Sequence, residues 1–243
     1  MIIMYHNVDT ESGFNTVSVS SLKEQLLYLK CNYKILSLDK YTDNLNRDGS
    51  FVAITVDDAY ISFKDKILPL LNELDIPATL FVPVDHVGKF NIWDREKRID
   101  IMGWNDLRTI AKEKNVTIGS HGKSHKRFSG LNNEEIEKEI IESKQKLEKE
   151  LSYSIRHFSF PFGQLNDYTE FSIEMLKNSA YFSSCSTRYG RKNNEADRYQ
   201  MFRIEVEPDD TLEDFKRKCN GRLHRKLIKR HIKEILINLG VIK

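Results

Sequence analysis

Residues 51–58 read Phe51-Val-Ala-Ile-Thr-Val-Asp57-Asp58, an apolar run that ends in two adjacent carboxylates. A short run rich in β-branched residues, closed by polar residues, predicts a buried strand over 51–56. A second apolar run over 116–119 leads in the same way into two histidines, His121 and His125. Carboxylates and imidazoles therefore follow two of the predicted strands directly.

Strand-like and helix-like segments alternate outward from this stretch. Apolar runs predict strands over residues 2–5, 33–37, 51–56, 78–82, 116–119, 157–160, 181–184 and 201–206. Helical periodicity predicts helices through Leu22, Leu26 and Leu29 and over residues 63–74, 104–111, 132–151 and 171–179. This alternation indicates parallel βαβ units, either as a barrel-like or as a doubly wound α/β sheet. In barrel enzymes the chemistry lies at the C-terminal ends of the strands, where the acidic pair and the histidines are expected.

Length and composition describe an ordinary globular chain. The 243 residues suffice for one large α/β domain, or two small ones, with a full core. No apolar run is long enough to cross a membrane, and the N-terminus lacks the pattern of a secretory signal. We therefore expect a cytoplasmic protein or one that is peripheral at the inner membrane face. The three cysteines, Cys31, Cys185 and Cys219, show no short pairing and fit packing roles in a reduced compartment.

The end of the chain is strongly basic. Between Lys216 and Lys243 ten basic residues stand against one acidic residue, and the preceding part is mildly acidic. Apolar residues spaced along one face predict a basic amphipathic helix, which either packs on the body or contacts an anionic membrane surface. Nucleic acid is a poor candidate partner, because the basic stretch is short and carries no recognition motif. No feature of the sequence sets an oligomeric state.

The acidic pair and the histidines have both structural and chemical interpretations. Two carboxylates at a strand end can simply cap the next helix. Because neighbouring strand residues point in opposite directions, one carboxylate can bind a metal while the other acts as a base. His121 and His125 are four residues apart, which on a helical turn places both rings on one face. Joined to a carboxylate, they supply the ligands of an open three-ligand metal site.

A third feature is the turn after the strand predicted over residues 157–160. Pro161 and Gly163 flank Phe162 there, and Arg156 precedes the strand. The turn either ends the strand or directs a backbone N–H toward an oxyanion, while Arg156 pairs with a carboxylate.

Taken in order, these motifs resemble the polysaccharide deacetylases of the NodB type, carbohydrate esterase family four. They are Asp57-Asp58, His121-x-x-x-His125 and Arg156-x-x-x-x-Pro161-x-Gly163, and residues 4–8, 76–82, 102–108 and 203–211 also look like this family. The resemblance covers about residues 1–215. It implies a distorted (β/α) barrel as a single catalytic domain over 1–215, and the basic amphipathic helix predicted from the spacing of the tail occupies 216–243. It also implies metal-dependent removal of N-acetyl groups from a glycan substrate.

The resemblance also implies a role for each site residue. A divalent metal, usually zinc, would be held by Asp58, His121 and His125. Asp57 would be the general base, and Arg156 would pair with it. The backbone N–H of Phe162 would bind the oxyanion.

The resemblance also bears on the acid that protonates the leaving amine, because here the sequence differs from the usual family pattern. The usual late Leu-x-His segment is missing, and the early Tyr5-His6-Asn-Val8 resembles the first strand of a permuted subgroup, similar to the poly-N-acetylglucosamine de-N-acetylases of biofilms. His6 is therefore the expected acid, the alternative being a buried histidine hydrogen-bonded at a strand end. Ala59 and Gly122 also depart from the family. Ala59 replaces a usual Gly, so we expect its turn to avoid positive φ, and Gly122 replaces a Ser or Thr whose hydroxyl would brace the histidine loop.

Three functions remain open at this point. The first is a de-N-acetylase acting on N-acetylated aminosugars in a cell-surface glycan or its precursor. The second is a non-catalytic carbohydrate-binding protein of the same fold, and the third is a hydrolase of a small non-sugar amide. A complete set of metal ligands and acid–base groups favours catalysis. Aromatic side chains along a groove would favour a sugar, and the candidates are Tyr60, Trp93 and Trp104.

Overall fold

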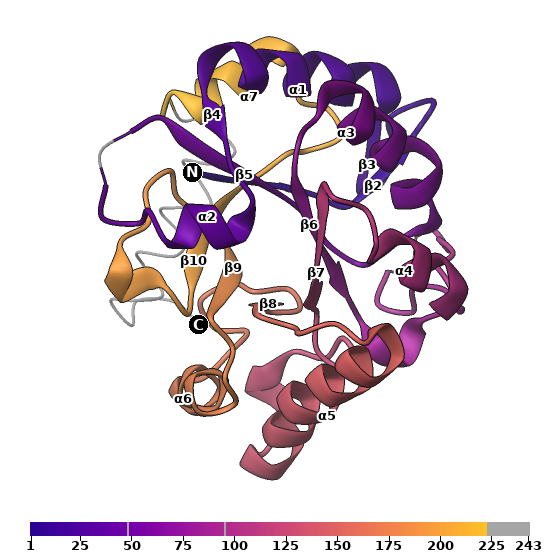
Figure 1. The fold of residues 1–243 in the computed structure, drawn as a ribbon, viewed down its shortest axis with the longest axis vertical. Coiled ribbons are helices and arrows are strands. Elements are labelled where there is room, and N and C mark those ends of the chain that lie inside the picture. The colour runs from indigo at the N-terminus through magenta and orange to yellow at the C-terminus, as the bar shows by residue number, and fades with distance from the viewer. Residues whose placement is uncertain (48, 95, 223–243) are drawn as a thin grey trace.

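The computed structural model describes residues 1–47, 49–94 and 96–222, and Figure 1 shows its helices arranged around a central group of strands. The barrel strands are β1 (Ile2–Tyr5), β5 (Phe51–Val56), β6 (Ala78–Val82), β7 (Val116–Ser120), β8 (His157–Ser159), β9 (Ser183–Tyr189) and β10 (Met201–Glu205). They are parallel neighbours in the order β1-β10-β9-β8-β7-β6-β5, and β5 pairs with β1 to close the ring. A further strand, β4 (Lys34–Ile35), extends the sheet beyond β5. The (β/α) barrel predicted from the sequence is confirmed.

The strands alternate between the inside of the barrel and the surrounding helices. Inside, a small apolar cluster joins residues of five strands: Ile2, Ala53, Phe81, Cys185 and Met201. The neighbours Ile3 and Ile54 belong instead to the larger cluster under the helices. Because strand side chains alternate, the inward set of β5 continues from Ala53 through Thr55 to Asp57. Both faces are covered, which explains why these strands are continuous apolar runs.

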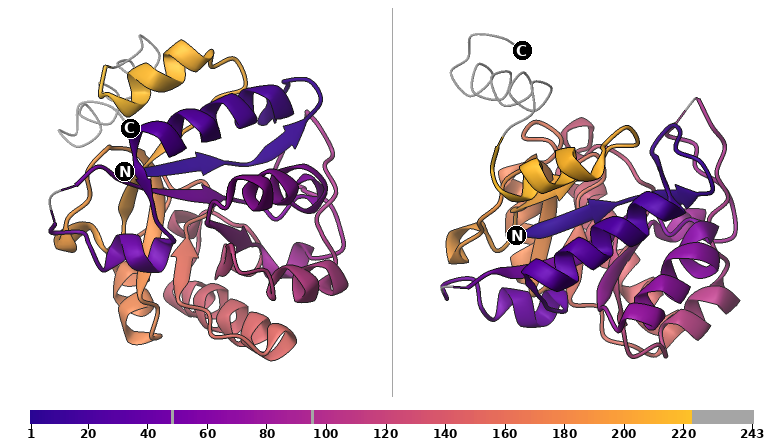
Figure 2. Two further views of the ribbon diagram at one scale, coloured as in Figure 1. Left: turned by 45° about the horizontal axis from the view of Figure 1, so that its top comes forward. Right: turned by 90° about the horizontal axis from the view of Figure 1, so that it is seen from above.

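The helices pack around the outside of the barrel. They are α1 (Val19–Asn32), α2 (Leu38–Thr42), η1 (Phe63–Ile67), α3 (Leu68–Leu74), η2 (Val84–His86), α4 (Trp104–Ile110), η3 (Phe128–Gly130), α5 (Asn133–Leu151), α6 (Glu170–Asn178), η4 (Glu195–Asp197) and α7 (Leu212–Cys219). A separate pair of short strands joins β2 (Asn7–Asp9) to β3 (Thr16–Ser18). Figure 2 shows α1 and α7 side by side, where the rings of Tyr28 and Phe215 meet edge to face at 6.1 Å. The segment expected as one helix over 63–74 consists of a π-helical turn followed by α3.

The largest difference from the predicted elements is β9. It begins at Ser183 and continues to Tyr189, whereas the expected strand covered 181–184. Its residues are mostly small and polar, so no apolar alternation marks it in the sequence. Ser184 and Ser186 are buried and donate hydrogen bonds to backbone carbonyls of the neighbouring segment, which compensates the burial of their hydroxyls.

The expected domain boundary at 215/216 falls inside α7. Phe215 and Cys219 of this helix are both buried, so the packed body continues at least to Cys219. The greater part of the basic helix predicted over 216–243 lies outside the described residues, and its contact with a membrane stays a prediction. Among the described residues, no helix combines the length and apolarity that crossing a membrane needs.

Candidate active site

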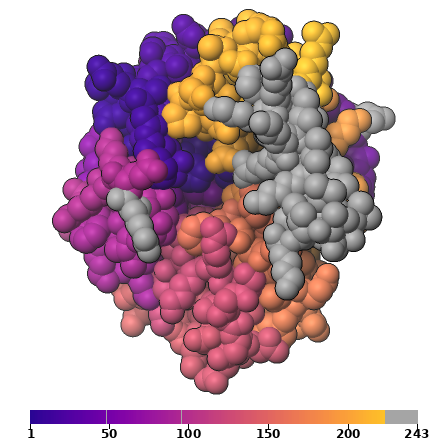
Figure 3. Space-filling view, turned by 180° about the vertical axis from the view of Figure 1, so that it is seen from behind, coloured from indigo at the N-terminus to yellow at the C-terminus, as the bar shows by residue number. Residues whose placement is uncertain are grey.

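A cavity of about 160 Å³ lies at the C-terminal ends of the barrel strands. It is lined by His6, Asn15, Asp57, Asp58, Trp93, Asp94, His121, His125, Phe162, Thr187 and Glu205. Figure 3 shows the molecule from the side opposite to Figure 1. Early (indigo), middle (magenta and pink) and late (yellow) parts of the chain lie next to one another on the face seen there. The cavity brings together every predicted site residue except Arg156.

Three buried side chains converge at one point of this cavity. Asp58 Oδ1 lies 3.4 Å from His121 Nε2 and 3.2 Å from His125 Nε2. The carboxylate oxygen has no hydrogen-bond partner within the described structure, although it is buried. His121 Nδ1 lies 2.8 Å from the carbonyl oxygen of Ser159, to which it donates, so that Nε2 is the ring nitrogen that faces Asp58. One carboxylate and two imidazoles at this spacing fit a divalent cation with an open position.

The protonation of the triad follows from burial and from mutual contact. Burial acts to raise the pKa of Asp58, but the two imidazoles hold that pKa well below its usual range. Burial lowers the pKa of His125 to about 4, so its ring is neutral at pH 7, the form that binds metals. Burial also acts to lower the pKa of His121, but the carboxylates of Asp57 and Asp58 outweigh it and raise that pKa.

The backbone at this end of the barrel is strained. Asp58 has φ 73° and Ala59 has φ 53°, so the expectation that the turn avoids positive φ is wrong. The sharp turn after β5 brings the Asp58 carboxylate back to the two histidines, and the left-handed conformation costs about 1–2 kcal/mol for each non-glycine residue. His125 (φ 55°) and Phe162 (φ 61°) share this conformation. Four such residues at one cavity indicate that the surrounding packing enforces the geometry.

The histidine loop is held by a carboxylate that the sequence reading missed. The helical turn expected between His121 and His125 is absent. Instead, Glu139 of α5 is buried and its Oε2 accepts the backbone N–H groups of Lys123 (2.7 Å) and Ser124 (2.8 Å). Its Oε1 accepts the Ser124 hydroxyl. Because residue 122 is a glycine without a hydroxyl, we expected this loop to be poorly braced. Glu139 provides the bracing instead.

Arg156 is not part of the site, which corrects its predicted pairing with Asp57. It directly precedes β8, at the N-terminal end of the barrel, where its Nη1 lies 2.7 Å from Asp39 Oδ1. In a parallel barrel a residue that begins a strand is separated from the C-terminal rim by the length of the strand. Its guanidinium, with 46% of the side chain exposed, therefore serves the opposite end of the molecule.

Arg203 of β10 takes the place predicted for Arg156. It is fully buried and binds Asp57 with two parallel hydrogen bonds, Nη1 to Oδ1 at 2.8 Å and Nη2 to Oδ2 at 2.7 Å. Nη2 also donates to the hydroxyl of Ser159, which in turn donates to Asp57 Oδ2. Its remaining donors reach Thr55 Oγ1 and the carbonyl of Ser186. The sequence did hold a signal, since a charged residue occupies an inward position of an apolar strand.

This pairing keeps Asp57 ionised. Burial acts to raise the pKa of the carboxyl, but the charges of Arg203 and His121 outweigh it, and the pKa lies below its usual value. Asp57 Oδ2 lies 4.0 Å from His121 Nε2, directly beside the triad. An ionised carboxylate next to a cation site is the arrangement that a general base requires.

Aromatic rings enclose the triad. Trp93 stacks on His125 with ring centres 3.7 Å apart and planes at 17°, and Phe162 meets the same imidazole edge to face at 5.1 Å. Of the other aromatic candidates, Tyr60 is buried and Trp104 lines a different hollow. His6 follows β1 and lines the cavity, so its position fits its predicted role, which stays a prediction.

The fold and the site define a hydrolase built on a NodB-type deacetylase barrel with an Asp-His-His metal triad. A family model described as polysaccharide deacetylase matches residues 44–180, more than half of the chain. The chain belongs to the polysaccharide deacetylase family, and its class is that of the amide-hydrolysing deacetylases of carbohydrate esterase family four.

Individual relatives agree with this assignment. The chain is 24% identical over 203 residues to a poly-β-1,6-N-acetyl-D-glucosamine N-deacetylase of Staphylococcus epidermidis, covering 80% of this chain and 69% of the relative. It is 30% identical over 137 residues to the Escherichia coli (strain K12) protein of the same name. The matched region covers 49% of this chain but only 20% of that protein. The solved structure of the Streptococcus pyogenes deacetylase PplD in complex with acetate is similar in fold. Its TM-score is 0.76 at 20% identity, covering 90% of this chain and 96% of that one.

Proposed function

We propose that this chain removes the acetyl group from N-acetylated aminosugars in a cell-surface glycan or its precursor. The observation that carries the proposal is the meeting, in one cavity, of the metal triad and the ionised Asp57. Two relatives are named for the de-N-acetylation of poly-β-1,6-N-acetyl-D-glucosamine, which supports a glycan of this kind.

The triad would hold a divalent metal through Asp58, His121 and His125. Two imidazoles and one carboxylate suit zinc, which we propose as the ion. When bound, it supplies a Lewis acid that polarises the acetamide carbonyl and makes water more acidic.

The residues of this chain would divide the remaining chemistry between them. Asp57, held in place by Arg203 and Ser159, accepts a proton from the water that attacks the acetamide carbon. The backbone N–H of Phe162 donates a hydrogen bond to the oxygen that gains negative charge. Protonated His6 gives its proton to the amide nitrogen as the carbon–nitrogen bond breaks, which yields acetate and a free amine.

The size of the cavity limits what enters it. At about 160 Å³ it is smaller than the roughly 300–1,000 Å³ of sites that enclose a whole small ligand. We infer that only the acetamide end of one sugar reaches the base, while the rest of the glycan lies outside.

Release of acetate from N-acetylglucosamine oligomers tests the proposal. The zinc-loaded protein should release acetate, a chelator should abolish the release, and added zinc should restore it. Asp57→Asn should lower kcat by about 10²–10⁴-fold, and His6→Gln should do so within the same range. Arg156→Met, at the other end of the barrel, is the control and should leave kcat unchanged.

The alternatives give different results in the same assays. A non-catalytic binding protein would bind the oligomers and release no acetate from any of them. A hydrolase of small amides would act on simple acetamides and release no acetate from the sugar oligomers. Either result from the zinc-loaded protein would refute the proposed function.

A further inference from the structure

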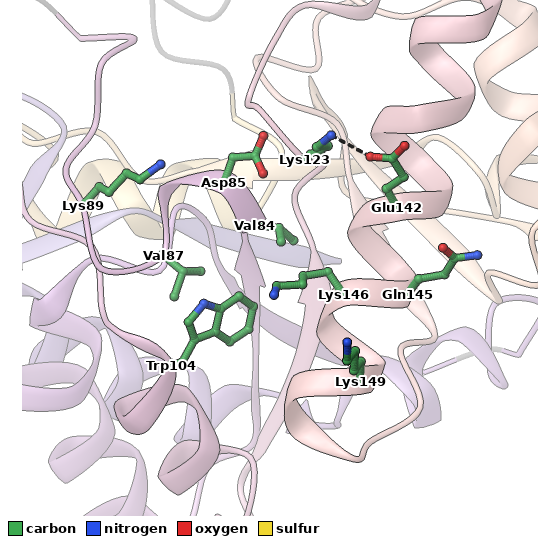
Figure 4. A pocket seen from close by; sticks show the side chains of 10 residues that line it. All are labelled: Val84, Asp85, Val87, Lys89, Trp104, Lys123, Glu142, Gln145, Lys146 and Lys149. Carbon is green, nitrogen blue, oxygen red and sulfur yellow. Dashed lines mark hydrogen bonds and ion pairs between the residues drawn. The ribbon is translucent and has the colours of Figure 1, made fainter.

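A second and larger hollow lies behind the histidine loop. Its volume is about 510 Å³, within the range of sites that hold a small ligand. Figure 4 shows the residues that line it, which come from η2, α4, α5 and the histidine loop: Val84, Asp85, Val87, Lys89, Trp104, Lys123, Glu142, Gln145, Lys146 and Lys149. Nothing in the proposed deacetylation uses this hollow.

The lining combines an apolar surface with positive charge. The side chains of Val84 and Val87 are buried, and the half-buried indole of Trp104 lies beside Val87 (Figure 4). Around this surface stand four lysines and two carboxylates, a net charge of +2. One face of α5 supplies four of the polar side chains, because residues 142, 145, 146 and 149 are spaced three and four apart.

Two of the four lysines have their charge satisfied within the protein. Lys123 Nζ lies 2.6 Å from Glu142, and Lys146 Nζ lies 3.0 Å from Glu150. In the part of the chain that the structure describes, Lys89 and Lys149 have no ion-pair partner. Both are exposed and border the hollow, so their ammonium groups are available to a bound anion.

The wall of this hollow is also the support of the metal loop. The backbone N–H of Val84 donates to the carbonyl of Gly122 at 3.2 Å, and that of Asp85 donates to the carbonyl of Lys123 at 2.8 Å. On the other side, α5 carries Glu139 one turn before Glu142. The hollow is therefore fixed to the active site by hydrogen bonds along the loop between the two metal-binding histidines.

Two aromatic contacts and one shared residue link the active-site cavity to the hollow. Trp93 stacks on His125 and also meets His86 edge to face at 5.0 Å. His86 lines a neighbouring depression, and Lys89 lines both that depression and the larger hollow. The depression therefore shares Lys89 with the hollow, and its His86 contacts Trp93 of the active-site cavity.

We propose that this hollow is a binding subsite for a negatively charged sugar unit, one that carries a carboxylate or a phosphate. The apolar face of its ring would lie on Trp104, and its anionic group would meet Lys89 and Lys149. An amine product or a neutral acetylated sugar gains nothing from this charge, so the lining selects an anionic unit. The identification as a sugar rests on the proposed function, and the subsite deepens it by making the substrate an acetylated glycan with negative charges.

Binding can be measured at this subsite alone, because the chain has only two tryptophans. In a Trp93→Phe protein, Trp104 is the single tryptophan and its fluorescence reports on the hollow. We expect saturable changes with N-acetylglucosamine 6-phosphate and with an oligosaccharide of alternating N-acetylglucosamine and glucuronate. A neutral N-acetylglucosamine oligomer and inorganic phosphate should bind at least about tenfold more weakly.

Removing the charges of Lys89 and Lys149 tests how much these two lysines contribute to binding. Each exposed lysine contact is worth roughly twofold to fivefold in affinity. Lys89→Ala combined with Lys149→Ala should therefore weaken binding of both charged probes by about 4-fold to 25-fold. Lys138→Ala is the control, since this lysine lies on α5 outside the hollow and pairs with Glu134. Equal affinity for charged and neutral oligomers, an unchanged affinity in the double variant, or inorganic phosphate binding as tightly as the sugar phosphate would overturn the proposal.

Acetate release separates this inference from the proposed function. In otherwise unaltered protein, the double lysine variant should raise KM for the glucuronate-containing oligosaccharide, with kcat unchanged, and should leave the neutral oligomer unaffected. Acetate release without any response of Trp104 would refute the subsite alone. A response of Trp104 without acetate release from any substrate would refute the deacetylase function and leave an anionic-sugar site.

Discussion

The pairing of Arg203 with Asp57 predicts a large loss of stability when the arginine is replaced. Arg203→Met removes a fully buried guanidinium and leaves the buried Asp57 carboxylate without its ion-pair partner. Breaking a buried ion pair from one side costs about 3–5 kcal/mol. For a domain of this size, each kcal/mol lowers the melting temperature by about 2–4 °C, so we expect a decrease of about 6–20 °C.

The measurement is urea unfolding followed by circular dichroism at pH 7, with a chelator present so that bound metal adds no stability. Because the folded pKa of Asp57 lies below its unfolded value, its contribution is fully present at this pH and is lost only as the pH falls through the folded pKa. Arg156→Met is the matched control, since that arginine is half exposed and its pair with Asp39 should contribute at most about 1 kcal/mol.

A double variant isolates the pair itself. Asp57→Asn combined with Arg203→Met should be less destabilised than the sum of the two single changes, with a coupling of about 0.5–3 kcal/mol. If Arg203→Met costs no more than Arg156→Met, or if the two single changes simply add, the buried pair does not hold this end of the barrel together.

Three further predictions concern the histidine loop and the opposite end of the barrel. Glu139→Gln should weaken zinc affinity by about 10-fold to 100-fold in a competition titration against a chelator, because the loop loses its brace, whereas Glu142→Gln one turn later should not. Gly122→Ala should lower the free energy of unfolding by about 1–2 kcal/mol, because residue 122 has φ +73° and a Cβ there would lie 3.2 Å from Glu139 Oε2. Gly130→Ala is the control, because a Cβ there meets nothing within 4 Å, and it should stay within about 1 kcal/mol of wild type. The hydrogen bond from His157, partly opposed by burial, lowers the pKa of Asp39. Asp39→Asn should therefore destabilise the protein at pH 7, and progressively less below about pH 4, because the wild-type carboxylate protonates there. A difference in stability that does not change with pH would contradict this prediction.

Local patterns in the sequence sufficed for much of the fold. Apolar runs located the barrel strands other than β9, because a strand covered on both faces leaves a continuous signal. The polar strand β9 escaped for the converse reason, since its buried serines are compensated by hydrogen bonds to a segment distant in sequence. Its start and length depend on pairing in three dimensions and not on its own pattern.

The site shows the same division between local and long-range information. The metal ligands directly follow strand ends, so the sequence placed them correctly at the rim. The partner of Asp57 did not follow from motif order, because β10 is brought beside β1 only by closure of the barrel. Glu139 lies on the same helical face as the buried Ile136 and Ile140, and a carboxylate on that face was the available sign of its role.

Closure of the barrel also has a consequence for how the protein is made. Among the barrel strands β1 is synthesised first and β10 last, yet they are neighbours in the ring. Asp57 is synthesised 146 residues before Arg203, whose guanidinium pairs with it in the folded protein. A nascent chain lacking β10 therefore has an open seam, and its Asp57 carboxylate lacks the Arg203 partner. Barrel closure and formation of the Asp57–Arg203 pair should thus occur as one late event of biosynthesis.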